Sequence, residues 1–407
     1  MSRLQMTGFL LLVLLVQTAC SNLQSNLSTV ELSPFLQDQW FPAVPETFRP
    51  ESPEDLFSLP ESYRRQLDIQ VLSEESEYER YKKLRQWAFR RFEDFEFSSL
   101  ETVSLAELNS ARKINCLSFS ALFVAAARYT NVPAEFQLVF APPYWDQVNT
   151  SWINNQHINV TGTIEVPVTA YVPQRTGRLG DIPVRFGDGD LTGTYRYVAD
   201  VNPAVVSMRT RRQIISENEV ISLFYSNKTI EHLLRSDLAA AYAYTKLALQ
   251  TYPESSLAWN NLGVLYSRVN QTELAIAAYE IAISADDNAY SARSNLARLY
   301  RNTGQENLAR GLEREIARFR ESNPYYHASL AEAELEKGNL QQARSLYREA
   351  LQRKHNEQHF YHQLAIISQA LGNNEEVKEH LRSAQRYARG EDRARFANKL
   401  QALEDLL

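Results

Sequence analysis

The sequence predicts a multidomain protein in which an α+β domain is followed by an all-α solenoid. Three observations lead to this prediction. The second half of the chain repeats its small residues every 34 positions, the first half combines helical and alternating apolar patterns, and a short apolar leader precedes both. The 407 residues are enough for two or three domains that each have a core.

The first twenty residues have the features of an export signal. Arg3 provides a basic start, and residues 9–16, FLLLVLLV, form an apolar run too short to span a bilayer. The next residues, QTAC, resemble the end of a bacterial lipoprotein signal. The resemblance implies that the signal peptide of residues 1–19 is removed and that Cys20 is lipidated, with palmitate among its acyl chains.

Two details bear on this interpretation of the leader. Gln17 departs from the usual lipoprotein pattern, in which leucine is commoner, and the alternative is an ordinary signal peptide cut after Ala19. Ser21 follows the cysteine, and a residue other than aspartate at that place fits sorting to the outer membrane in Gram-negative bacteria. The resemblance therefore implies a lipoprotein held in the outer membrane by its lipid and facing the periplasm.

Residues 20–60 are rich in Ser, Pro, Glu and Asn, which is typical of a tether between an anchor and a folded domain. Phe35, Trp40 and Phe41 are the side chains by which such a tether could dock. The formal net charge of the chain is −6, without a basic cluster, so we expect no nucleic-acid partner. After the leader, no apolar run is long enough to span a membrane.

The second half of the chain has a period of 34 residues. Gly304, Gly338 and Gly372 are 34 residues apart. The same step relates a series of alanines: Ala241, Ala275, Ala309 and Ala343. Residues 257–287 show the clearest unit, with large and small apolar residues on one helical face of each half. This pattern resembles the tetratricopeptide repeat (TPR), in which antiparallel helix pairs stack because one pair cannot bury its own apolar face.

We expect TPR repeats over residues 222–391, followed by a capping helix over residues 392–407. The repeats fall into five units: 222–255, 256–289, 290–323, 324–357 and 358–391. The first unit lacks the glycine but keeps Ala241, Ala248 and Pro253. The resemblance implies a groove that binds a protein or peptide partner. The alternative is a short array that only packs against the preceding domain.

The α+β domain, residues 61–215, holds the only cysteine outside the leader, Cys116. Asn115 is a good N-cap, and Cys116 falls in the first turn of a helix that is apolar nearly all round. The positive end of the helix dipole favours a thiolate at this place. The alternative is a buried structural cysteine, which packs as a small apolar residue.

One histidine and one aspartate could activate this thiol. His157 is the only histidine of the domain and lies in an alternating, strand-like run. An imidazole can both accept the proton of a cysteine and pair with its thiolate, although a lone histidine is commonly a structural or surface residue. Asp200 ends the β-rich run TYRYVAD, and a carboxylate at a strand end can orient an imidazole. Three other aspartates lie in a glycine-rich, loop-like stretch: Asp181, Asp188 and Asp190.

The order of Cys116, His157 and Asp200 resembles the transglutaminase-like superfamily, within the papain-like cysteine fold. The resemblance covers roughly residues 80–205 and implies that these three residues form a catalytic triad, without a metal or cofactor. Two places depart from the family pattern. Ile114 stands where many relatives have glycine, and Ile158 and Asn159 stand where an aromatic residue soon follows the histidine.

Such a triad would perform acyl transfer through a thioester on Cys116. With water as acceptor the enzyme is a cysteine protease or amidase, a hydrolase; with an amine it is a cross-linker. The sequence leaves both open. Tyr144, Trp145 and Trp152 precede His157 and are candidates for binding substrate, although loop aromatics often only pack. The alternative function is an inactive lipoprotein adaptor that acts through its TPR groove.

A redox-sensing thiol is a third interpretation of Cys116. It would need a resolving cysteine, and none remains in the chain once Cys20 carries lipid.

Overall fold

The computed structural model describes residues 31–98, 101–140, 145–148, 151–154, 157–167, 185–186, 192–201, 211–388 and 390–404. The chain divides into two compact units. The first contains the described parts of Met1–Pro53, Leu100–Thr102 and Ser216–Ile316. The second contains those of Glu54–Ser99, Val103–Ile215 and Ala317–Leu407.

The α+β part of the second unit consists of short helices and a mostly antiparallel sheet. Its elements are α2 (Pro53–Phe57), α3 (Glu61–Gln70), α4 (Glu77–Phe92), β1 (Glu96–Phe97), the 3-10 helix η3 (Leu105–Glu107), β2 (Lys113–Ile114), α5 (Cys116–Tyr129), β3 (Glu135–Val139), β4 (Trp145–Val148), β5 (Ser151–Asn154), β6 (His157–Pro167), β7 (Arg185–Phe186), β8 (Thr192–Ala199) and β9 (Arg212–Ile214).

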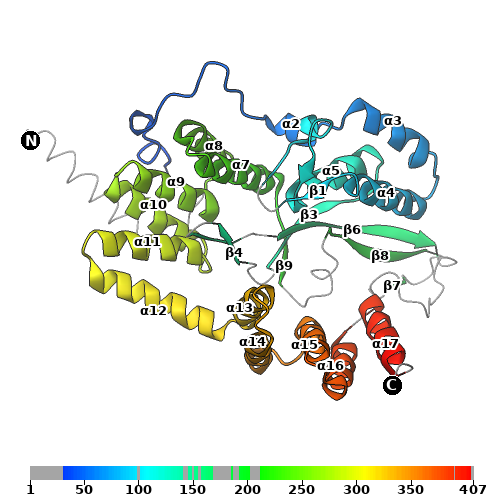
Figure 1. Cartoon of the computed structure of the whole chain (residues 1–407). Helices are drawn as coiled ribbons and strands as arrows, with labels where there is room; N and C mark the ends of the chain where they lie inside the picture. The colour runs from blue at the N-terminus through cyan, green and yellow to red at the C-terminus, as the bar shows by residue number, and fades with distance from the viewer. Residues whose placement is uncertain are drawn as a thin grey trace, which may run out of the picture. The chain divides into compact units, whose positions relative to one another are not determined.

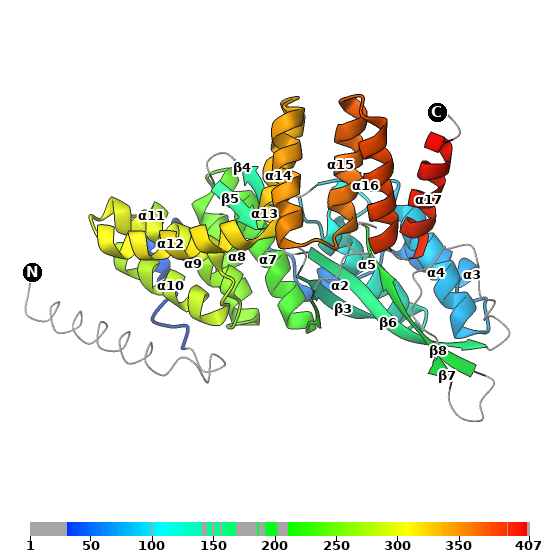
Figure 2. The same ribbon diagram turned by 90° about the horizontal axis from the view of Figure 1, so that it is seen from below.

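Five strands form the main sheet, in the order β7-β8-β6-β3-β9, and each neighbouring pair is antiparallel. Figure 2 shows β3, β6 and β8 side by side. Helices α4 and α5 pack on β6 (Figure 1). Helix α5 is buried from Leu117 to Ala127, which its nearly uniform apolar sequence predicts. The α+β architecture expected for this part of the chain is therefore present.

Aromatic rings fill the space between the two helices and the sheet. The ring of Tyr197 on β8 lies 4.3 Å from that of Tyr81 on α4 and 6.1 Å from that of Phe123 on α5, measured between centroids. The Tyr197 hydroxyl donates to the carbonyl oxygen of Pro133 at 2.6 Å. This ring and this carbonyl both lie against Gly162 of β6, where a Cβ atom would be 2.0 Å from the Pro133 oxygen. The core therefore requires glycine at this position.

The repeats form antiparallel helix pairs, and each of the five expected units contains one pair. In the described residues the helices are α7 (Glu217–Leu234) with α8 (Leu238–Thr251), α9 (Ser256–Arg268) with α10 (Thr272–Ala285), α11 (Tyr290–Asn302) with α12 (Glu306–Ser322), α13 (Pro324–Glu336) with α14 (Leu340–Arg353), α15 (Gln358–Ala370) with α16 (Asn374–Tyr387), and finally α17 (Gly390–Glu404). Among these residues, no helix is long and apolar enough to cross a membrane.

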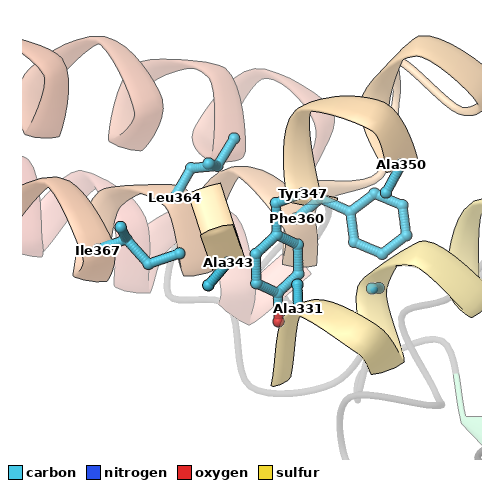
Figure 3. Close-up of a cluster of buried hydrophobic side chains, with 8 residues drawn as sticks. Ala331, Ala343, Tyr347, Ala350, Phe360, Leu364 and Ile367 are labelled. Carbon is cyan, nitrogen blue, oxygen red and sulfur yellow. The ribbon is translucent and has the colours of Figure 1, made fainter. Parts of the chain in front are cut away.

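Small residues allow close packing in the repeats, and aromatic residues fill the remaining space. In the second compact unit of the chain, Ala331, Ala343 and Ala350 are buried around Tyr347 and Phe360 (Figure 3). The centroids of these two rings are 6.2 Å apart. Burying a ring such as that of Phe360 contributes about 2–3 kcal/mol, so stacking of α13, α14 and α15 supplies most of the stability that each helix lacks alone.

The turns between paired helices share one backbone conformation. Gly304, Gly338 and Gly372 have φ values of 76°, 79° and 77°, in the left-handed region that favours glycine. Ser236 and Asn270, which precede Gly304 by two periods and one, have φ values of 60° and 58°. The first repeat, residues 222–255, therefore keeps the turn although its sequence has lost the glycine.

Replacing Ser236 with glycine is expected to raise the free energy of unfolding by about 0.5–1 kcal/mol, because a left-handed φ strains any residue with a Cβ. The opposite substitution in a matched turn, Gly304→Ala, should lower it by about 1 kcal/mol, since nothing lies within 4 Å of the added atom and only the strain counts. Urea unfolding checks both. Equal stabilities of the wild type and both variants would contradict the prediction.

The expected tether of residues 20–60 is packed in its described part. Phe35 and Phe41 contact aromatic rings of α8 and α9 in the first unit, whereas Trp40 is 43% exposed. Phe35 and Phe41 therefore dock in the way expected of them, whereas Trp40 does not, and the sequence did not show which residues of the repeats they contact.

Candidate active site

Cys116 is the first residue of α5, and its position is held by the helix start. The Asn115 side chain accepts a hydrogen bond from the Ser118 amide at 2.9 Å, which makes Asn115 the N-cap, as its sequence context predicts. The Ser118 hydroxyl in turn donates to the Val103 carbonyl at 2.9 Å and accepts from the Val103 amide at 3.0 Å. The thiol of Cys116 is a free, partly exposed group at this fixed helix start.

His157 is brought to this place by the sheet. It is the first residue of β6, and its antiparallel partner on β3 is Val139. The Ser120 hydroxyl of α5 donates to the Ile158 carbonyl at 3.4 Å, so the first turns of α5 lie on the beginning of β6. The imidazole of His157 is hydrogen-bonded to Cys116.

Asp200 reaches the imidazole from the next strand. It follows the last residue of β8, and the pairing of Ala199 with Val160 places it beside the start of β6. Its carboxylate oxygens lie 2.9 and 2.8 Å from Nε2 of His157. The Asp200 side chain is fully buried and that of His157 is 15% exposed. Because Nε2 faces Asp200, Nδ1 is the ring nitrogen that remains for Cys116.

This environment changes the charge that His157 carries. Burial by itself would lower the pKa of His157, but the hydrogen bonds and negative charges of Asp200 and Cys116 outweigh burial and raise that pKa to about 10. The imidazole is therefore an imidazolium at neutral pH, with a carboxylate on one nitrogen and the cysteine on the other. This is the arrangement that a cysteine nucleophile requires.

Two further residues interact with the carboxylate, and neither was predicted from the sequence. Asn159 Nδ2 donates to Asp200 Oδ2 at 2.8 Å, and the Asn159 side chain is fully buried. Arg212 interacts with Asp200 by charge; burial lowers the pKa of Arg212, and the charge of Asp200 opposes this effect. The sequence does place Asn159 on the same strand face as His157, because the two residues are two positions apart on one strand. No sequence pattern places Arg212 near His157, because its position depends on the pairing of β9 with β3.

The remaining predicted residues lie on a separate pair of strands or outside the described chain. Trp145 and Trp152 belong to β4 and β5, which form an antiparallel hairpin. Tyr144 lies outside the described residues, as does Cys20. The three alternative aspartates of the glycine-rich stretch also lie outside them. Within the residues that the structure describes, no cluster of three His, Cys, Asp or Glu side chains could hold a metal ion.

Comparison with known proteins identifies one of the repeats. The tetratricopeptide repeat family model matches residues 257–288. Similar solved structures include YrrB, described as a TPR protein with an unusual peptide-binding site, at 17% identity, covering 41% of this chain and 86% of YrrB with a TM-score of 0.23. PilF of Pseudomonas aeruginosa is 15% identical, covering 42% of this chain and 78% of PilF with a TM-score of 0.25.

A third similar structure is MamA, residues 41 to the end, from Desulfovibrio magneticus RS-1. It is 13% identical and covers 41% of this chain and 94% of its own, with a TM-score of 0.23. No curated protein sequence matches the chain. The prediction of tetratricopeptide repeats is confirmed for residues 257–288, and the described C-terminal region continues as helix pairs of the same kind.

Proposed function

We propose that this protein is a transglutaminase-like cysteine enzyme that transfers acyl groups through a thioester on Cys116. The observation that carries the proposal is the contact of three residues from α5, β6 and the end of β8, with an imidazole whose pKa is raised to about 10. TPR repeats generally bind protein or peptide partners. We propose that the repeats here recruit such a partner, and that lipid on Cys20 anchors the protein in the outer membrane, facing the periplasm.

The residues divide the chemistry as follows. The Cys116 sulfur attacks an amide carbonyl of the substrate, and backbone N–H groups of the first turn of α5 stabilise the oxyanion. His157, as imidazolium, donates its proton to the leaving amine, which departs and leaves a thioester on the sulfur. His157 then accepts a proton from water or from an amine that attacks the thioester. Asp200 stabilises the imidazolium and holds its orientation through both steps.

Alkylation of Cys116 tests the proposed ion pair directly, because it is the only thiol in a chain that begins at residue 21. At about pH 6 we expect iodoacetamide to label the wild type about 10-fold or more faster than the His157→Ala variant, since loss of the imidazolium removes the positive charge beside the sulfur. The measurement is the rate of mass gain by mass spectrometry.

A matched control comes from a second histidine–aspartate pair in the same chain. His232 Nδ1 lies 3.0 Å from Asp237 Oδ2 in the first unit, so His232→Ala removes a comparable pair and should leave the labelling rate unchanged. Equal rates in the wild type and in His157→Ala would contradict the enzyme proposal. The adaptor, with an inert α+β domain, would then be the better description.

One fluorescent amine distinguishes a cross-linking enzyme from a hydrolase. A cross-linking enzyme incorporates dansylcadaverine into a glutamine-containing acceptor protein, and a hydrolase releases ammonia or cleaves the acceptor instead. Cys116→Ser should abolish either product.

A further inference from the structure

The N-terminal segment is held on the repeats by contacts of the kind that bind a peptide ligand. We define the strap as residues 31–53, which run beside α8 and α9 of the same unit (Figure 1). Its only described helix is the 3-10 turn η2, Asp38–Trp40. The strap therefore depends on side-chain contacts for its position.

The first anchor of the strap surrounds Phe41. Its ring stacks on Tyr242 of α8 with centroids 4.0 Å apart, and its side chain is 8% exposed. Phe35 contacts Trp259 of α9 edge to face at 5.2 Å. The Tyr266 hydroxyl donates to the Phe35 carbonyl.

A carboxylate completes this anchor. Both oxygens of Asp38 accept from Lys246 Nζ at 2.8 Å, and one also accepts from the Tyr242 hydroxyl at 2.8 Å. These hydrogen bonds lower the pKa of Asp38, so the group is charged at neutral pH. The anchor thus combines two rings with a charged group.

The second anchor surrounds Glu51. Lys228 Nζ lies 2.8 Å from its carboxylate, with both side chains almost buried, and the Tyr244 hydroxyl donates to the same carboxylate at 2.6 Å. The Tyr225 hydroxyl donates to the Glu51 backbone carbonyl at 2.8 Å. Burial would raise the pKa of Glu51, but the hydrogen bonds from Lys228 and Tyr244 outweigh it and lower that pKa. Phe48 adds an edge contact with the Tyr244 ring at 5.6 Å.

The helices therefore present a set of groups whose partners lie on the strap. We call it the strap surface: Tyr225, Lys228, Tyr242, Tyr244, Lys246 and Tyr266. Each of its four tyrosine hydroxyls donates to a strap atom, and each of its two lysines pairs with a strap carboxylate. Residues 42–47 between the anchors are exposed. Two separate anchors joined by an exposed stretch are the arrangement of a bivalent ligand rather than of a core element.

We propose that the strap surface is a peptide-binding site that the chain's own strap occupies, and that a partner binds there by displacing it. The partner chemistry follows from the strap: an extended peptide with two carboxylates about thirteen residues apart, each beside an aromatic side chain. A tethered strap has a high effective concentration, so it keeps the site closed to weaker ligands. The proposal stands independently of the chemistry at Cys116.

The test is binding of a fluorescein-labelled peptide of residues 31–53, followed by anisotropy. The receptor is the chain from residue 21 carrying Phe41→Ala and Glu51→Gln, which weakens both anchors and leaves every helix residue unchanged. This double variant should bind the peptide at least about 10-fold more tightly than the wild type, whose own strap competes. Adding Lys228→Gln and Tyr242→Ala to the double variant should abolish binding.

Two controls test whether the peptide is recognised by its charges and whether the variants remain folded. A peptide with Asp38→Asn and Glu51→Gln should fail to bind the double variant, because the recognition is of charge and not only of rings. The helical circular dichroism of all variants should match the wild type. A double variant that retains its helices and does not bind the peptide, or that binds it no better than the wild type, overturns the proposal and makes the strap a fixed part of the fold.

A second route covers a double variant that does not fold. A protease site placed at the exposed residues 43–47 leaves both anchors native during folding, and cleavage after purification frees the half that contains Phe35, Asp38 and Phe41. We expect this half to separate on gel filtration and the labelled peptide then to bind. Retention of the cut half, or its loss together with helix content, overturns the proposal.

Discussion

Replacing Asp200 with alanine is expected to lower the free energy of unfolding of the α+β domain by about 3 kcal/mol. The substitution removes a fully buried carboxylate and leaves two donors, His157 Nε2 and Asn159 Nδ2, without the acceptor that lies 2.8 Å from each. A buried charged or polar group that loses its partner keeps its desolvation cost, and this makes the effect large. Urea unfolding, followed by circular dichroism and tryptophan fluorescence, measures it.

A pair in the repeats whose carboxylate is exposed is the control for this substitution. Glu349 Oε2 lies 3.1 Å from His327 Nδ1, but the Glu349 side chain is 42% exposed. Glu349→Ala should therefore cost at most about 1 kcal/mol, because the carboxylate that is removed is exposed to solvent. A similar cost for both substitutions would show that burial of the Asp200 carboxylate is not what stabilises the site.

The His157–Asp200 pair should make the free energy of unfolding depend on pH in a known direction. The pKa of His157 is raised to about 10 in the folded protein from 6.5, the ordinary value expected when it is unfolded. The stabilisation is therefore complete below pH 6.5 and is lost as the pH rises through about 10. Asp200→Asn should remove most of this dependence. Titration of the His157 ring protons by NMR reports the pKa directly, and identical titrations in the wild type and in this variant would contradict the assignment.

The second large effect is expected at Gly162. Its replacement by alanine should cost about 3 kcal/mol, because the new Cβ would lie 2.0 Å from the Pro133 carbonyl oxygen and 2.6 Å from the Tyr197 ring. The carbonyl is backbone and cannot move away as the end of a flexible side chain could. The Tyr197 ring is itself held by the bond from its hydroxyl to the same carbonyl. Thermal unfolding of the purified variant checks the prediction.

The neighbouring Thr163 provides the control for Gly162. Thr163 lies on the same strand and is exposed. Its replacement by alanine is therefore expected to change the free energy of unfolding by no more than about 0.5 kcal/mol. A Gly162→Ala variant as stable as Thr163→Ala would mean that β6 shifts to accept the methyl group. The tight crossing of Tyr197 over β6 would then not be a constraint on the core.

Local pattern accounts for the parts of this protein that could be predicted. The 34-residue period places the helix pairs, since a helix presents its small residues at regular spacing to a neighbour of similar sequence. The N-cap at Asn115 and the apolar run after it place Cys116 at the start of a buried helix. His157 in an alternating run is found on a strand. Each of these predictions depends only on residues close in the chain.

Other features depend on pairings between distant segments. Asn159 and Arg212 lie at the carboxylate because β6 pairs with β8 on one side and with β3 on the other, and β3 pairs with β9. Register between strands far apart in sequence has no local signature, so Arg212 could not be assigned in advance, and Asn159 could be placed only on the strand face of His157. The strap shows the same limit, because its aromatic residues could be named as docking side chains but their partners on the helices could not be.

The sequence by itself thus determined the repeat period and the helix and strand on which the cysteine and the histidine lie. Those features follow from hydrophobic periodicity and capping, which act over a few residues. Only the tertiary structure decided which groups meet at Asp200, why Gly162 must be glycine, and where residues 31–53 lie. Each of these is a contact between segments far apart in the chain, and its energy comes from burial and hydrogen bonding that exist only after folding.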